Sequence, residues 1–390
     1  MKHKSLMVAA FFVLLSACFG QTQASSGASP QFLYVNDSNF FNVINQVEGF
    51  SISRGGTLTP LAGSPFLTGG KTGIYGVGGY AGRDLAVTPD GHFLYAANQG
   101  TADISVFRVD LATGALTVSP TRYAVFPNTR HSQGAYMAMS SSGKFLFAAS
   151  GSPLELQTFV ISSSGALQYA SVPLPELRSQ ALDMIVTPDD KYLLVSDETH
   201  GVHVYSISAE GELTEVAGSP TVGQVSGITL DCSGQHMYLG DAQNTGTMVE
   251  GFSIADDGSL TALPGSPYQA AGGNNSNTVI LDSDGKFLYV ANQYSSQLSS
   301  FGVADDGSLA AVPTSPFADG NPGDQPAQMA LGRSGLLFAA GTPLSAFPSV
   351  NVFRRSRDGG LHLAAGSPVF LSTTAQPVSL ITIPAASCAP

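Results

Sequence analysis

The sequence predicts an all-β protein: a seven-bladed β-propeller of four-stranded antiparallel blades, closed by the C-terminal strand joining the N-terminal blade. Three observations predict it. A short aromatic-aliphatic phrase recurs seven times, and a tight turn containing Gly followed by Leu also recurs seven times. No stretch beyond the extreme N-terminus has helical periodicity. A repeat period of about 45–50 residues is typical of propeller blades, none of which can bury its apolar faces alone.

The composition agrees with this fold and limits the function. The 390 residues include 44 Gly and 23 Pro, but only 11% are charged, which suits many short strands joined by turns. The formal charge of −12, without a cluster of Lys and Arg, disfavours nucleic acid as a partner. Because the repetition is uniform, we expect one cooperative domain and a monomer.

The first residues differ from the repeats and indicate export. Two lysines precede an apolar run over 6–15 that is too short to span a bilayer as a permanent helix. The run ends in Leu-Ser-Ala-Cys, which resembles the lipobox of bacterial lipoprotein signals. Cys18 is therefore the expected lipidation site and the only expected membrane anchor. The alternative is ordinary secretion with cleavage after Ala24.

These features divide the chain into an export signal at 1–18, a flexible linker at 19–30, a single propeller at 31–384 and a tail at 385–390. We expect the protein in the periplasm or cell envelope. Export permits a disulfide between Cys232 and Cys388, but we favour two isolated residues. We expect no cofactor and no metal, since zinc ligands would lie closer together.

Each repeat contains four strand-like segments in a fixed order. Inner strands begin near residues 84, 135, 182, 226, 277, 327 and 378. A tight turn leads to the aromatic-aliphatic phrase, which begins at 31, 92, 144, 191, 235, 286 and 335. The third strand alternates apolar and polar residues, as in "VHVYSIS" at 202. A Gly turn precedes the fourth strand, which usually ends in Ser-Pro, a pairing typical of a protected sheet edge.

The order of the strands predicts how the ring closes and where ligands bind. The chain begins at a second strand and ends at an inner strand, so residues 378–383 should complete the blade begun by residues 31–65. Both short turns of every blade lie at one face, and the longer connections lie at the other. Binding is expected on this loop-rich face, near the central channel.

Three motifs on the chain are better explained as turns and loops. "GGKTG" at 69–73 lacks the first Gly of a phosphate-binding loop, and no helix follows. The acidic turns at 256–258 and 282–285 lack the downstream Glu of a calcium loop.

A group of ionisable residues on the loop-rich face forms the candidate site. Histidine can act as an acid or base near neutral pH, and arginine can hold a carboxylate or phosphate. The group comes from two adjacent blades, with one arginine from a neighbouring blade: Arg83, Arg130, His131, Arg178, Glu198 and His200.

At these repeats the sequence resembles the bacterial lactonase family of seven-bladed propellers. That family includes 6-phosphogluconolactonases and the fungal carboxymuconate lactonising enzyme. The resemblance rests on "VTPDGHFLYAANQGTADISVFRVD" at 87–110, "DSDGKFLYVANQYSSQLSSFGVADDGSL" at 282–309 and the "LTPLAGSP" type of fourth strand. It covers nearly everything from Gln31 onward and shades into the broader YVTN and WD40-like propellers.

The resemblance implies lactone opening or closing by His, Glu and Arg at the channel mouth. It gives Glu198 the family's acidic role, with His131 and Arg178 as its His and first Arg. Where a second Arg is expected, the sixth blade offers Asn277, which with Arg83, Arg130 and His200 would bind substrate.

Two functions follow as hypotheses. One is an exported lactonase of a sugar-derived or carboxylated lactone. The alternative is a non-catalytic envelope propeller that binds a protein, peptide or glycan.

Overall fold

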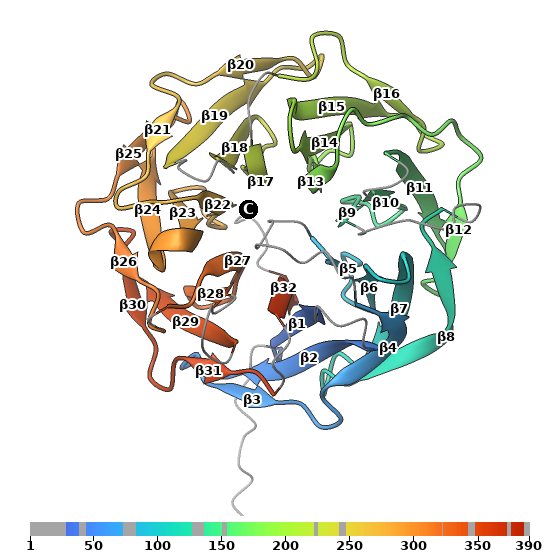
Figure 1. Cartoon of the computed structure of the whole chain (residues 1–390), viewed down its shortest axis with the longest axis horizontal. Helices are drawn as coiled ribbons and strands as arrows, with labels where there is room; N and C mark the ends of the chain where they lie inside the picture. Colours follow the sequence, from blue (N-terminus) through green and yellow to red (C-terminus); the bar gives the residue numbers. More distant parts are fainter. Residues whose placement is uncertain are drawn as a thin grey trace, which may run out of the picture.

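Seven antiparallel sheets form a ring around a central channel (Figure 1). The computed structural model describes residues 29–38, 44–72, 83–126, 136–149, 154–221, 225–241, 247–321, 323–341, 348–372 and 376–385. Among these residues the only helical element is a short 3-10 turn, η1 (Gln293–Ser295). The predicted all-β class and the seven blades are confirmed.

The blades are numbered from the one that contains the first strand, and the inner strand is given first for each. Blades 1 and 2 consist of β32 (Gln376–Ile383), β1 (Phe32–Ser38), β2 (Ile44–Ile52), β3 (Leu58–Pro60) and β4 (Phe66–Lys71), then β5 (Leu85–Val87), β6 (Phe93–Asn98), β7 (Asp103–Val109) and β8 (Leu116–Ala124). Blades 3 and 4 consist of β9 (Tyr136–Met139), β10 (Phe145–Ala149), β11 (Leu156–Ile161) and β12 (Leu167–Tyr169), then β13 (Ala181–Val186), β14 (Tyr192–Asp197), β15 (Gly201–Ile207) and β16 (Leu213–Glu215).

Blades 5 to 7 repeat this order and add a short fifth strand. Blade 5 consists of β17 (Val225–Leu230), β18 (His236–Asp241), β19 (Met248–Ile254), β20 (Leu260–Ala262) and β21 (Tyr268–Gln269). Blade 6 consists of β22 (Ser276–Leu281), β23 (Phe287–Asn292), β24 (Gln297–Val303), β25 (Leu309–Ala311) and β26 (Phe317–Ala318). Blade 7 consists of β27 (Pro326–Leu331), β28 (Leu336–Gly341), β29 (Ser349–Arg355), β30 (Leu361–Leu363) and β31 (Val369–Phe370).

The two ends of the chain share blade 1, as the strand order predicts. Strand β32 pairs antiparallel with β1, from Phe32 opposite Ile383 to Asn36 opposite Ser379. The inner strand of this blade therefore comes from the C-terminal end of the chain, and the ring cannot close without it.

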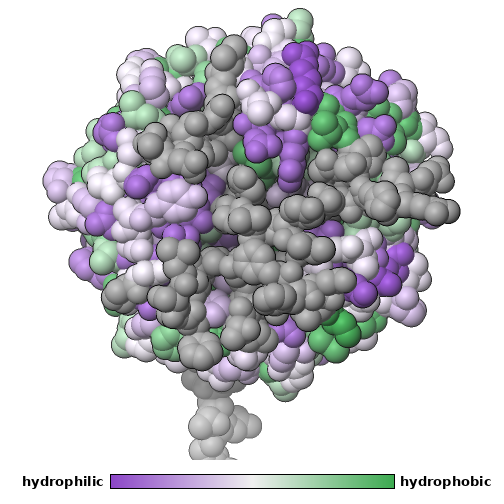
Figure 2. Space-filling model, viewed as in Figure 1, coloured by the Kyte–Doolittle hydropathy of each residue, from purple (hydrophilic) through white to green (hydrophobic). Residues whose placement is uncertain are grey.

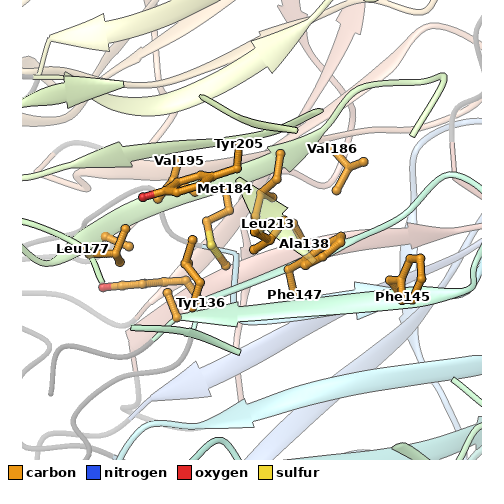
Figure 3. Close-up of a cluster of buried hydrophobic side chains, with 14 residues drawn as sticks. Tyr136, Ala138, Phe145, Phe147, Leu177, Met184, Val186, Val195, Tyr205 and Leu213 are labelled. Atoms are coloured by element: carbon orange, nitrogen blue, oxygen red, sulfur yellow. The ribbon is translucent and has the colours of Figure 1, made fainter. Parts of the chain in front are cut away.

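The apolar core lies between the blades. The described residues form seven buried clusters, and each cluster contains side chains of two adjacent blades. In the cluster between blades 3 and 4, Tyr136 and Phe147 face Met184, Val195 and Leu213 (Figure 3). Burial of apolar area at every interface, at about 25 cal/mol per Å², makes the ring cooperative.

The recurrent aromatic phrase and the recurrent Gly turn hold neighbouring blades together. The ring of Phe93 in blade 2 lies against Gly165 in blade 3, where a Cβ atom would come within 2.3 Å of it. Tyr95 Oη, two residues on, donates to the carbonyl oxygen of the same glycine at 2.9 Å. The Tyr34–Gly114 and Tyr238–Gly307 pairs repeat this hydrogen bond. The turn must therefore be Gly, both for its positive φ and for the close ring.

We expected the Ser-Pro dipeptides to end the outer strand, but the structure places them within the edge of the sheet. In five blades a Ser-Pro with a cis peptide bond interrupts the edge, and in four of these the chain then pairs again with the third strand, through β4, β21, β26 and β31. At the interruption the serine hydroxyl accepts a backbone N–H of the third strand, as Ser367 Oγ does from Val352 at 2.9 Å. The serine thus replaces a ladder acceptor.

One polar position of the third strand holds the crossover that arrives from the preceding blade. Ser105 Oγ donates to Thr68 O at 2.9 Å, and Ser299 Oγ donates to Ala271 O at 2.8 Å. Glu48, at the same register, accepts the backbone N–H of Ser372 at 2.9 Å. These bonds fix the start of the long connections on the loop-rich face.

Of the three cysteines, Cys232 alone lies among the described residues. Cys232 forms a disulfide, so the preference for isolated cysteines is wrong for this residue. Cys18 and Cys388, together with the predicted export signal, lie outside the described residues. Within those residues, helical segments of the length and hydropathy needed to cross a bilayer are absent.

Candidate functional site

Arg83 crosses the channel and joins three blades. It precedes β5 of blade 2, and its Nη1 lies 2.7 Å from Asp183 Oδ1 and 2.8 Å from the Met184 carbonyl oxygen of blade 4. Its Nη2 donates to the Ile228 carbonyl oxygen of blade 5 at 2.7 Å. The Arg83 side chain therefore lies in the channel, where three protein acceptors already bind it.

Asp183 is the buried partner of this arginine. Its Oδ2 also accepts the backbone N–H of Ile228 at 2.9 Å. Burial raises the pKa of Asp183 to about 6, although Arg83 and the backbone donors oppose the shift. Arg83 and Asp183 line a channel cavity of about 420 Å³ that extends to Cys232 near the short-turn face.

A chain of ionisable side chains runs outward through blade 4 on the loop-rich face. Asp197, at the end of β14, contacts His200 Nδ1 at 3.1 Å and His203 Nε2 at 2.9 Å through its Oδ2. His203 Nδ1 lies 2.8 Å from Glu215 Oε1, and Glu215 Oε2 lies 3.9 Å from an Nη of Arg178. Five side chains of one blade are thus linked.

The electrostatics of this cluster favour ionised groups. Burial alone would raise the pKa of Asp197, but hydrogen bonds from His203 and from the His200 backbone hold it below its usual range. Burial alone would lower the pKa of His203, yet its two carboxylate partners raise it. His203 thus lies between Asp197 and Glu215 inside the blade, and these two carboxylates favour its cationic form.

His200 is the exposed histidine of the cluster. Its side chain is 40% exposed, whereas that of Asp197 is fully buried. Thr199 Oγ1 lies 2.8 Å from the same Nδ1 that faces Asp197. When Nδ1 carries the proton, Nε2 keeps its lone pair, and the described residues offer it no hydrogen-bond partner. A buried carboxylate that orients an exposed imidazole suits acid–base chemistry.

The other predicted residues lie on the same loop as this pair, in another blade or outside the described residues. Glu198 is exposed on the same loop, and its backbone N–H donates to Gln180 O at 3.0 Å. Asn277 is buried in blade 6, where its Nδ2 donates to Gln293 Oε1 at 3.2 Å. Arg130 and His131 lie outside the described residues. Convergence of the predicted triad thus stays a prediction.

Sequence reasoning missed His203, Glu215 and Asp183. His203 occupies the third-strand position that is also polar in other repeats, as Ser105 of blade 2 and Asn351 of blade 7 show. Aligning the repeats at this position would have identified it as a buried polar residue.

The loop-rich face is mainly polar where it can be described. Figure 2 shows hydrophilic and intermediate residues over most of the coloured surface, with hydrophobic residues in separate patches. Such a face suits a ligand rich in oxygen atoms.

Fold and site together define a closed seven-bladed propeller with an acid–base cluster on its loop-rich face. A model of the family described as lactonase, 7-bladed beta-propeller, matches residues 70–129 and 126–369. The chain therefore belongs to this lactonase family.

Individual relatives match the chain over a short stretch or at low sequence identity. The 6-phosphogluconolactonase of Yersinia enterocolitica is 32% identical over 104 residues, which are 25% of this chain and 28% of the relative. The match thus spans little more than a quarter of that relative. The periplasmic gluconolactonase of Pseudomonas aeruginosa has a similar fold, with a TM-score of 0.64 at 20% identity over 87% of this chain and 98% of that one. A protein of Bacteroides uniformis also has a similar fold, with a TM-score of 0.71 at 20% identity over 91% of this chain and 100% of that one.

Proposed function

We propose that the protein hydrolyses a sugar-derived or carboxylated lactone on the loop-rich face of blade 4, with His200 as the general base. The observation that carries this proposal is the contact between the exposed His200 and the buried Asp197, in a chain of the lactonase family. The buried carboxylate orients the ring and stabilises the imidazolium that forms when Nε2 accepts a proton.

Each remaining group has a role in the proposed hydrolysis. Water gives a proton to His200 Nε2, and its oxygen attacks the lactone carbonyl. The ring C–O bond then breaks, and the ring oxygen takes the proton back, which yields the open hydroxy acid. Glu198, exposed beside His200, orients the water, and Arg178 at the rim holds an anionic substituent of the substrate. His131 remains a proposed second acid.

An unphosphorylated sugar lactone fits the proposed location better than a phosphorylated one. The predicted export signal would separate the protein from intracellular sugar phosphates. Among the similar proteins, one is named a periplasmic gluconolactonase.

A pH-stat assay with glucono-δ-lactone and its 6-phosphate tests the activity. We expect His200→Gln to lower kcat by about 10²–10⁴-fold. Glu198→Gln should lower it less, and Arg178→Gln should raise KM for anionic lactones. Glu212→Gln, an exposed change on the short-turn face, is the matched control.

Two results would contradict the proposal. One is full activity in His200→Gln. The other is an inactive wild-type protein with every lactone offered, which would support the non-catalytic envelope propeller instead.

We also propose export with a lipid anchor at Cys18. The mass of the mature N-terminus and detergent partitioning test it. An unmodified N-terminus that follows Ala24 would show soluble secretion.

A further inference from the structure

The crossover from blade 6 to blade 7 carries two buried carboxylates, Asp319 and Asp324. Asn351 of β29 contacts both, since its Nδ2 lies 3.2 Å from Asp319 Oδ2 and 3.5 Å from Asp324 Oδ2. Ser349 Oγ donates to Asp324 Oδ2 at 2.7 Å. All four residues are at most 1% exposed. The crossover is therefore attached to blade 7 through a buried, oxygen-rich cluster.

Two oxygen atoms of this cluster have no hydrogen-bond partner among the described residues. They are Asp319 Oδ1 and Asn351 Oδ1. A buried polar atom without a partner costs about 1–3 kcal/mol. Because Asn351 Nδ2 is directed at both carboxylates, its unpaired Oδ1 lies on the opposite side of the same amide.

The cluster also lacks a counter-charge among the described residues. Four of the other mostly buried carboxylates each contact a basic side chain, in the pairs Asp103–Arg122, Asp183–Arg83, Asp197–His203 and Asp282–Arg355. Burial raises the pKa of Asp319, and the charge of Asp324 raises it further. Burial also raises the pKa of Asp324. Two unpaired negative charges are unfavourable here, so the cluster needs a proton or a cation.

We propose that Asp319, Asp324 and Asn351 bind a hard divalent cation, with Ca²⁺ the preferred ion, which fixes the crossover to blade 7. Rotation of the Asn351 amide exchanges Nδ2 for Oδ1 and directs a third oxygen at the ion without moving the backbone. Ca²⁺ accepts irregular sets of about six to eight oxygen ligands. Backbone carbonyls and water complete the shell.

Asn351 distinguishes a cation from a shared proton. A proton between the two carboxyl groups would remove a charge, but it would leave the amide oxygen unpaired. A cation takes up the charge and binds the rotated amide through its oxygen, which leaves Nδ2 in the position that Oδ1 occupied. Binding must then compete with protons for the carboxylates, so affinity rises with pH. This proposal departs from the expectation of no metal.

Thermal unfolding of the chelator-treated full-length protein, followed by circular dichroism, tests the site. We expect Ca²⁺ at a hundredfold excess over Kd to raise Tm by roughly 3–4 °C. Isothermal titration should show tighter binding at pH 8 than at pH 6.

Two substitutions locate the effect. Asp319→Asn should abolish the Ca²⁺ response, while its metal-free Tm stays at or above that of the metal-free wild type, because a buried charge is removed. Asp84→Asn is the matched control: Asp84 is also buried with an unpaired oxygen, but in blade 2. It should keep the full response.

Two outcomes overturn the proposal: no shift of the wild type by Ca²⁺ or Mg²⁺, or an unchanged shift in Asp319→Asn. A shift by Mg²⁺ alone supports the site and reassigns the ion.

Discussion

Removal of Arg83 should destabilise the ring in a pH-dependent manner. Replacement by Met keeps much of the side-chain volume but leaves Asp183 buried without its positive partner. It also removes the donors to Met184 O and Ile228 O. Loss of one partner of a buried ion pair costs about 3–5 kcal/mol. Because the Arg83 side chain is 34% exposed, water moderates the effect, and we expect about 3 kcal/mol at pH 8.

The loss should be smaller at low pH. The pKa of Asp183 is raised from 3.8 to about 6, so its charge already opposes folding by roughly 3 kcal/mol above pH 6. The folded state binds the extra proton, and stability therefore falls as pH rises from 4 to 6. At pH 5 the carboxyl is mostly protonated and needs no counter-charge. Only the carbonyl hydrogen bonds are then lost, at about 1–2 kcal/mol.

Urea unfolding at pH 5 and pH 8 measures both values. The chain has 0 Trp, so circular dichroism is the suitable signal. The double variant Arg83→Met/Asp183→Asn removes the charge as well and should recover stability at pH 8 relative to Arg83→Met. An equal loss at both pH values, or no recovery in the double variant, would refute the reasoning.

Three further predictions concern single positions. Gly165→Ala should lower stability by about 3–5 kcal/mol, because its Cβ meets a ring at 2.3 Å, whereas Gly218→Ala, with nothing within 4 Å, should cost about 1 kcal/mol in thermal unfolding. The pKa of His203 is raised in the folded state, so the stability that its charged ring contributes is fully present below pH 6.5 and is lost as pH rises through the raised pKa. In His203→Gln the urea midpoint of unfolding should therefore depend less on pH between pH 6 and 9. Cys232→Ser should cost about 2–4 kcal/mol, and non-reducing peptide mapping should join Cys232 to Cys388.

The fold could be predicted because its defining contacts recur with the repeat. The aromatic phrase and the Gly turn are visible in the sequence at seven places, and the structure shows that they contact one another across each pair of blades, as Tyr95 and Gly165 do. The closure of blade 1 followed from the strand at which the chain begins. The prediction that the Ser-Pro dipeptides end the outer strand was wrong. A serine hydroxyl that replaces a backbone acceptor leaves no pattern in the hydrophobicity of the sequence.

The face and the blade of the candidate site could be predicted from the sequence, but several of its residues could not. His200 and Arg178 were found because they lie on exposed loops, where a charged residue is noticeable. His203 was not, because a polar residue in an alternating strand is normally assigned to the solvent side. Its burial depends on Asp197 and Glu215, which come from two other strands. Such a contact is set by register between strands, and spacing along one strand does not reveal it.

The two faces of the ring differ in how freely their chemistry can vary. On the short-turn face, glycine and an aromatic ring must fit each other, so substitution of either one destabilises the ring. On the loop-rich face, the fold requires only a polar side chain that reaches the arriving crossover. Glu48, Ser105 and Ser299 all meet this need with different groups. His203 and Asn351 occupy the same position, and each contacts carboxylates of a proposed site. Function can therefore change at this position while the ring remains closed.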